Sequence, residues 1–231
     1  MYTRDIKQWI FSLKDGEIIL AKQAYESNFI DMKEATFYQL LARLNEEKVI
    51  GKIAKGLYFK PMGNNVDTLP SLDKLLEFFT NKNRNGMLVG EKMLENYGII
   101  SNSIDQYNIY TNVIEIKTQR KVSKLVIENV DVDYKNESMR KTIEVLELIE
   151  TIDNYSDVNY DNIYNMLKEF SSIYKEDILS KIIQAKGYKK RNIASLKLIL
   201  DYFKIPNNLS RQLNTASKYS FPKNIDKALK R

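Results

Sequence analysis

Three helix-like stretches followed by two β-rich runs fill the first 62 residues, and this order limits the possible folds more than any other feature. Apolar residues at helical spacing predict a first helix, namely Ile6, Trp9, Ile10 and Leu13, and Asp15-Gly16 ends it. The apolar run 17–20 predicts one strand, and a second helix is expected at about 21–27. Asp31 and Glu34 have the spacing of a capping box, which predicts a third helix from there to about Lys48.

The third predicted helix has two different faces. Its apolar residues, expected in the core, are Phe37, Leu40, Leu41 and Leu44. The polar residues on the opposite side are Thr36, Gln39 and Arg43. The runs 49–53 and 57–60 flank a Gly-containing turn, which predicts a β-hairpin. Three helices followed by a hairpin is the order of a winged helix-turn-helix.

A cluster of Pro, Gly and Asn at 61–65 marks a boundary in the chain. We expect a winged helix-turn-helix over 1–62 and a larger mixed α/β C-terminal domain over 63–231, so the fold class is α+β. The second domain is predicted to be β-rich at about 100–135 and helical at about 138–231. Within it, strands are expected at 107–111, 113–118 and 124–130, and helices at 71–80, 87–97, 139–152, 160–170, 175–185 and 191–203.

Cys and His are both absent from the 231 residues. Disulfides, zinc or iron–sulfur sites built from these residues, and catalytic triads with an imidazole base are therefore excluded. The charged N-terminus lacks the apolar segment of a signal peptide, and no stretch reaches the ~18 apolar residues of a membrane span. We expect a cytoplasmic protein with no membrane partner, no metal and no cofactor.

The third helix and the hairpin carry the residues that predict contact with double-stranded DNA. Polar side chains on a helix in the major groove reach base edges: Gln pairs with adenine, and Arg with guanine or phosphate. The stretch 48–60 has four Lys and no acid, which suits the DNA backbone. The candidate DNA-binding residues are Lys33, Thr36, Gln39, Arg43, Lys52, Lys55 and Tyr58. Tyr58 also suits the core, and the alternative for the whole unit is a module for protein contacts.

Charge is distributed unevenly, with about +2 over 1–62, about −7 over 63–180 and about +11 over 181–231. A basic patch interleaved with aromatic residues predicts an auxiliary contact with nucleic acid or an acidic partner, and its members are Lys186, Lys189, Lys190 and Arg191. The alternative is a solvated helix face followed by a frayed basic tail.

Asp131 and Asp133 stand two residues apart at the end of a strand-like run. Carboxylates at this spacing point to the same side of a strand and can hold Mg²⁺, as in nucleotidyltransferases. That chemistry also needs a phosphate-binding turn, and the glycine-led helix nearby begins with Gly90-Glu91, where the acid would repel phosphate. A polar strand end leading into a turn is therefore the preferred interpretation.

The sequence also resembles a known family. The runs Leu41-Ala-Arg-Leu44, Lys48-Val-Ile50 and Lys55-Gly-Leu-Tyr58-Phe-Lys-Pro61 resemble the N-terminal winged helix of AbiEi-type antitoxins. These are the antitoxin halves of bacterial type IV (abortive infection) toxin–antitoxin systems. The basic segment 185–191 resembles one that precedes the last long helix of that family.

The resemblance implies a transcriptional repressor that binds operator inverted repeats in its own promoter, and not an enzyme. It also implies a C-terminal antitoxin domain that opposes a toxin of nucleotidyltransferase fold. One alternative is a stand-alone winged-helix transcriptional regulator without a toxin, whose second domain senses a ligand or dimerises. The other is a Mg-dependent nucleotidyltransferase that uses Asp131 and Asp133.

Overall fold

The computed structural model describes residues 2–63, 65–116, 118–214 and 217–230. The chain divides into two compact units, Met1–Phe78 and Phe79–Arg231. The division falls inside helix α4 (Leu72–Thr80), later than the Pro- and Gly-rich cluster where the sequence places a boundary. Both units combine helices with a small sheet, and the predicted α+β class is confirmed.

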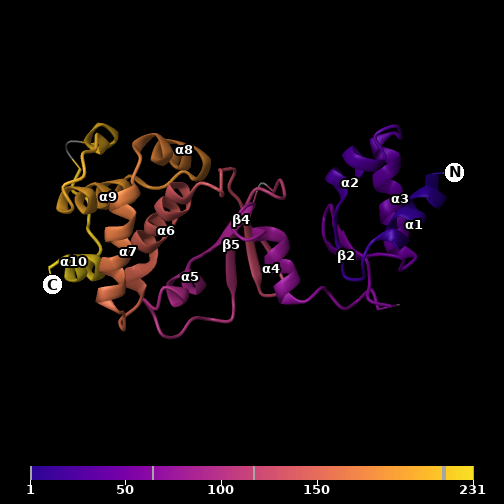
Figure 1. Cartoon of the computed structure of the whole chain (residues 1–231), viewed down its shortest axis with the longest axis horizontal. Coiled ribbons are helices and arrows are strands. Elements are labelled where there is room, and N and C mark those ends of the chain that lie inside the picture. The colour runs from indigo at the N-terminus through magenta and orange to yellow at the C-terminus, as the bar shows by residue number, and fades with distance from the viewer. Residues whose placement is uncertain (1, 64, 117, 215–216, 231) are drawn as a thin grey trace. The chain divides into compact units, whose positions relative to one another are not determined.

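The first unit begins with three helices and a three-stranded sheet. Its elements are α1 (Tyr2–Ser12), β1 (Ile18–Leu20), α2 (Ala21–Asn28), α3 (Glu34–Glu46), β2 (Gly51–Ala54) and β3 (Leu57–Phe59). The strand order is β1-β3-β2 with antiparallel pairs, and the three helices gather beside the sheet (Figure 1). This succession and this strand order are those of a winged helix-turn-helix, in which β2 and β3 form the wing.

Apolar faces of α1 and α3 meet in the core of this unit. Ile6 and Ile10 of α1 are buried, as are Phe37, Leu41 and Leu44 of α3. Each such side chain contributes about 1.5–3 kcal/mol through removal of apolar surface from water. Leu40, which was expected in the core, and Trp9, one of the apolar residues that predict the first helix, are half-buried and pack against its edge.

The wing depends on two glycines. At Gly51 a Cβ would lie 2.1 Å from the ring of Phe59, so only glycine lets the two strands approach here. Gly56 closes the turn with φ +76°, a left-handed conformation that glycine adopts without strain. The predicted hairpin is confirmed, with strands slightly shorter than expected.

The predicted start of the third helix is wrong. Helix α3 begins at Glu34, and its N-cap is Lys33, whose side chain makes no capping hydrogen bond. Asp31 lies in the turn before it, where the Met32 N–H donates to Phe29 O at 3.0 Å and the Tyr25 hydroxyl donates to Met32 O at 2.8 Å. This tertiary bond from α2 sets the turn, and the capping-box pattern does not describe it.

The second unit contains a mixed four-stranded sheet. Its strands are β4 (Gly86–Val89), β5 (Tyr107–Thr111), β6 (Arg120–Val122) and β7 (Leu125–Asn129), in the order β4-β5-β7-β6. Strands β5 and β7 pair in parallel, and the other two pairs are antiparallel. The strands expected at 107–111 and 124–130 are confirmed as β5 and β7. The described residues of 113–118 form no strand, and Lys117 lies outside the described residues.

The helix expected at 87–97 is only half correct. Met87–Val89 belongs to β4, which pairs with β5, and helix α5 spans Glu91–Asn96. The periodicity of this short apolar run does not distinguish a buried strand from a helix. Its pairing with β5 determines that it forms a strand.

Helices form the rest of the second unit. They are α6 (Glu137–Thr151), η1 (Ile152–Asn154), α7 (Tyr160–Ile173), α8 (Glu176–Lys186), α9 (Lys190–Tyr202), η2 (Leu209–Gln212) and α10 (Lys223–Leu229). Helix α6 packs against α7, α8 and α9, and Figure 1 shows it among them. It is the central helix of the unit, with Asn136 as its N-cap and buried residues along most of its length. The four helices predicted between 139 and 203 are confirmed within one or two residues, apart from the C-terminal end of α7.

The C-terminal tail is not frayed where it is described. Residues 223–229 form α10, which packs on α7 and buries Ile225, Ala228 and Leu229 in the core. Asn224 donates to the carbonyl oxygens of Ile152 and Tyr155 at 3.0 and 2.9 Å. Residues 215–216 and 231 lie outside the described part of the chain.

Within the described residues, every helix is too short or too polar to cross a membrane.

Candidate nucleic-acid interface

Helix α3 presents an exposed polar side along its length. Gln39 and Arg43 are exposed there, Lys33 is exposed at the N-cap, and Thr36 is half-buried. The helix turns every 3.6 residues, so the buried positions 37, 41 and 44 leave the stripe 35, 39, 42 and 46 facing away from the core. The four predicted contact residues on and beside α3 are therefore placed together on one side of the unit.

Small residues flank the central glutamine of this stripe. Ala35 lies one turn before Gln39 and Ala42 about one turn after it, and both are exposed. Short side chains at these positions let a helix approach a groove closely, while Gln39 can extend to the base edges.

Acidic residues limit the positive charge of the helix. Arg43 Nε donates to Glu47 Oε1 at 2.9 Å, and Lys7 of α1 donates to Glu47 Oε2 at 2.8 Å. Both hydrogen bonds hold the pKa of Glu47 below its usual range, and the bond from Lys7 has the larger effect. Glu47 is therefore ionised at neutral pH and shared by two cations.

The wing carries exposed lysines. Lys52 lies on β2, opposite Tyr58 of β3, and Lys55 lies in the turn beside Gly56. Both side chains are exposed, and the register shifts between Lys52 and Ala54, which increases the local twist. A pair of lysines on a short, twisted hairpin suits the phosphate backbone of a duplex.

The structure places Tyr58 in the core. It is 6% exposed and belongs to the cluster formed by α1, α2 and α3, and this burial raises the pKa of its hydroxyl. Residues 57–59 are all buried because β3 is the central strand of its sheet. Of the two roles left open for Tyr58, this burial supports the core role.

The C-terminal basic patch is largely neutralised by neighbouring groups. Lys186 forms an ion pair with Glu128 and lies 4.6 Å from the centre of the Tyr110 ring. Lys189 and Arg191 both approach Glu150, at 3.6 and 3.9 Å. Lys190 donates to Asn214 Oδ1 at 2.7 Å. The four side chains therefore share three partners, Glu128, Glu150 and Asn214, and two of these partners are carboxylates that reduce the positive charge of the predicted patch.

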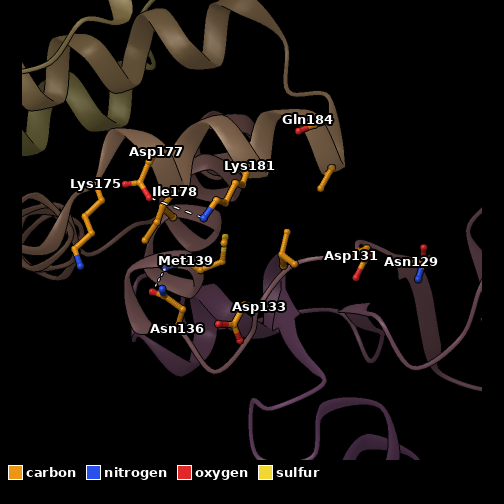
Figure 2. A pocket seen from close by; sticks show the side chains of 12 residues that line it. Asn129, Asp131, Asp133, Asn136, Met139, Lys175, Asp177, Ile178, Lys181 and Gln184 are labelled. Carbon is orange, nitrogen blue, oxygen red and sulfur yellow. Dashed lines mark hydrogen bonds and ion pairs between the residues drawn. The ribbon is translucent and has the colours of Figure 1, made fainter.

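Asp131 and Asp133 lie beyond the end of β7 and are both exposed, with buried Val132 between them. They line a cleft of about 790 Å³ (Figure 2). Figure 2 shows Lys175, Asp177 and Lys181 of α8 and its N-cap on the opposite side of the cleft. Asp133 Oδ1 accepts the backbone N–H of Lys135 at 3.1 Å, which is the turn geometry preferred from the sequence.

The lining of this cleft mixes acidic and basic side chains. Among the described residues, no group of three or more acidic side chains is placed to hold a metal ion. Lys181, which lines the same cleft, lies 4.0 Å from Asp177. The two aspartates lie across the cleft from Lys175 and Lys181, and the turn at a polar strand end stays the preferred interpretation of the pair.

Sequence reasoning missed two groups. The Arg43–Glu47 pair has the i, i+4 spacing that signals a helical ion pair, so the sequence contained its signal. The Lys7–Glu47 bond joins residues 40 positions apart, and nothing in the sequence indicated it.

A buried cluster was also missed: Glu147 Oε1 accepts hydrogen bonds from Tyr110 and Tyr188, each at 2.7 Å. Burial raises the pKa of Glu147, a shift that the sequence does not reveal.

Comparisons with known proteins add little to this picture. No family model matches the chain, and no curated protein is similar enough in sequence to match it. A solved structure, that of the Rv2827c protein from Mycobacterium tuberculosis, is similar with a TM-score of 0.34 and 10% sequence identity. The alignment covers 86% of this chain and 75% of that one.

Proposed function

We propose that this chain is a DNA-binding antitoxin that represses its own type IV toxin–antitoxin operon in the bacterial cytoplasm. The N-terminal unit binds operator inverted repeats, and the chain opposes a toxin of nucleotidyltransferase fold. Double-stranded DNA is the first partner, and no cofactor is involved.

One observation carries the DNA-binding part of the proposal. The exposed side of α3 and the wing carry polar and basic side chains on a fold whose third helix suits the major groove. Gln39 has the chemistry to read adenine, and Lys52 and Lys55 the chemistry to hold phosphates. Arg43 adds a guanidinium fork one turn beyond Gln39.

The antitoxin part is supported by sequence motifs. The runs 41–44, 48–50 and 55–61 that resemble AbiEi-type antitoxins fall at the end of α3, at the start of the wing and on β3. Leu41 and Leu44 are core residues, and Gly56 closes the wing. The motif therefore combines residues that build the fold with residues, such as Arg43, that face solvent.

The first experiment measures binding of the pure full-length chain to DNA from just upstream of its own gene, by fluorescence anisotropy. We expect a preference of about 10³-fold over scrambled DNA and a steep decrease in affinity with salt. Equal, weak binding to both DNAs would contradict the repressor role.

Coexpression tests the toxin part. Expression of a neighbouring gene for a nucleotidyltransferase-like protein should arrest growth, and expression of this chain should restore it. Specific DNA binding without such a neighbour, or without rescue, would favour a stand-alone winged-helix regulator.

A second candidate is a protein-contact module. The acidic residues on and next to α3, namely Glu34, Glu46 and Glu47, favour it because carboxylates are repelled by the DNA backbone. The salt titration separates the two candidates, since a protein-contact module would show no specific DNA complex at any salt concentration.

A further inference from the structure

The turn after α3 holds a lysine in the left-handed backbone conformation. Lys48 follows the C-cap Glu47 and has φ +58°. Two hydrogen bonds close the turn: the Lys48 N–H donates to Asn45 O at 3.0 Å, and the Val49 N–H donates to Leu44 O at 2.9 Å. A residue with a Cβ is strained in this conformation, and glycine is not. The chain therefore has a lysine where glycine would be the more stable residue.

The same turn occurs with glycine at the end of α5. Gly98 has φ +63°, and the N–H groups of Gly98 and Ile99 donate to Glu95 O and Leu94 O at 2.8 and 2.9 Å. These bonds join the same relative positions as the two bonds at Lys48. A strained residue held in place by its surroundings raises the question of what its side chain does.

Negative charge gathers at the end of α3 where Lys48 lies. Glu46 and Glu47 are exposed there, and the helix dipole adds partial negative charge at this end. Two other cations, Lys7 and Arg43, both bind Glu47. Among the described residues, the exposed Lys48 side chain has no ion pair and no hydrogen bond. Its ammonium group is therefore available to an anion from outside the chain.

Lys48 also lies between the two parts of the candidate interface. Helix α3 ends two residues before it, and β2, the first strand of the wing, begins three residues after it. The connection is held against the helix, because Asn45 Nδ2 donates to Ile50 O at 3.0 Å. A duplex that contacts both α3 and the wing brings its phosphates close to this connection.

We propose that Lys48 binds a phosphate of the DNA backbone, between the contacts of α3 and those of the wing. Its positive charge offsets the repulsion that Glu46 and Glu47 exert on the duplex. The inference rests on the proposed DNA binding of the first unit and adds a residue to that interface. It implies that the best residue for stability at this position, glycine, is a worse residue for binding.

Two substitutions separate the charge of Lys48 from the backbone strain. Lys48→Ala keeps a Cβ and removes the ammonium group, so it should weaken binding to promoter DNA about three- to tenfold and lower the salt slope by about 1, with an unchanged melting temperature. Lys48→Gly should weaken binding equally and raise the melting temperature of the first unit by about 2–5 °C, because it relieves the strain. Anisotropy measures binding, and the fluorescence of Trp9, the single tryptophan of the chain, follows unfolding of the first unit.

Lys204 provides the matched control, because it occupies the same turn in the second unit. It follows α9 with φ +59°, and the N–H groups of Lys204 and Ile205 donate to Asp201 O and Leu200 O at 3.0 and 2.9 Å. Its side chain is exposed. Lys204→Ala and Lys204→Gly should leave the DNA affinity unchanged. The glycine variant should still raise the melting temperature of the second unit, measured by circular dichroism.

A phosphate contact does not depend on base sequence, so the loss of affinity in Lys48→Ala should also appear with scrambled DNA at low salt. Equal binding of wild type and Lys48→Ala to scrambled DNA would overturn the proposal, whatever the preference for the promoter. Equal binding of wild type to both DNAs contradicts only the repressor role. A lower melting temperature of Lys48→Ala with unchanged binding would show that the lysine acts on the helix end, and would also overturn the proposal.

Discussion

Arg43 and Glu47 form an ion pair along the exposed side of α3, with 2.9 Å between Nε and Oε1. The Arg43 side chain is nevertheless 67% exposed. Since an Arg fork has five donors, one bond to Glu47 does not exhaust it. Glu47 thus orients Arg43 and also weakens its attraction for phosphate, and with Lys7 it holds two cations at one carboxylate.

Glu47→Gln should therefore strengthen DNA binding. The change removes a negative charge from the interface and releases Arg43 and Lys7, so we expect about three- to tenfold tighter binding and a salt slope steeper by about 1. Anisotropy titrations at several salt concentrations measure both. Glu46→Gln is the matched control, because it removes the same charge from an exposed neighbour. Identical effects of the two variants would show that only overall charge matters.

Gln39→Ala should relax specificity at one base pair. Gln39 stands between Ala35 and Ala42 on the exposed stripe, and a bidentate contact with adenine is worth about 1–3 kcal/mol of discrimination. Competition with operators substituted at single positions measures the loss. Gln8→Ala on α1 changes an exposed glutamine outside α3 and should leave the base preference as it is. An unchanged preference in Gln39→Ala would remove Gln39 from the set of base-reading residues.

Lys52→Ala and Lys55→Ala should weaken DNA binding evenly across sequences. Phosphate contacts carry no base information, so each change should lower the salt slope by about 1 without altering specificity. Lys14→Ala, an exposed lysine in the loop after α1, provides the comparison. A sequence-dependent loss in either wing variant would mean that the wing reads bases.

Glu147 should make stability depend on pH. Burial raises its pKa above the usual 4.5, so the unfolded chain loses this proton first as pH rises. As the pH rises from about 4.5 through the folded pKa of Glu147, the free energy of unfolding should therefore decrease. In Glu147→Gln this contribution is absent, and urea unfolding of both proteins across this range should give a difference that changes with pH.

The tyrosine partners of Glu147 provide a check on that result. The hydrogen bond from Tyr188 lowers the pKa of Glu147 against the effect of burial. Tyr188→Phe should therefore extend the pH-dependent loss of stability to higher pH, while its start near pH 4.5, set by the unfolded chain, stays the same. A pH-independent difference between wild type and Glu147→Gln would mean that Glu147 has an ordinary pKa.

Ile225→Ala should destabilise the second unit by about 2–5 kcal/mol, the usual cost of truncating a fully buried isoleucine. Lys230→Ala at the end of the same helix should cost far less, because its pair with Asp226 is exposed. Urea unfolding measures both. Near-equal stabilities would contradict a packed α10 and restore the interpretation of the tail as a basic arm.

Prediction from sequence succeeded where the signal was local. The wing followed from a glycine turn between two β-rich runs, and α6 to α9 followed from apolar positions at helical spacing. It failed where distant residues decide: Met87–Val89 becomes a strand because β5 lies beside it, and α10 is held by packing on α7.

The candidate sites divide in the same way. Exposure of Gln39 and Arg43 follows from the periodicity of one helix, so it was foreseen. The partners of the basic residues at 186–191 could not be foreseen, since Glu128, Glu150 and Asn214 lie outside this segment of the chain. Nothing in the sequence indicates that Asn192 Oδ1 is buried without a hydrogen-bond partner among the described residues, because such an atom exists only once its surroundings are packed.

The amino-acid sequence by itself determined the order of helices and strands in the first unit, the core positions Phe37, Leu41 and Leu44, and the polar side of α3. Those properties depend on spacing and turn chemistry within a few residues. Only the tertiary structure decided that Tyr58 is buried, that Glu47 holds Arg43 together with Lys7, and that the C-terminal lysines are paired. Burial and ion pairing depend on distances between residues far apart in the chain, and these distances exist only after folding.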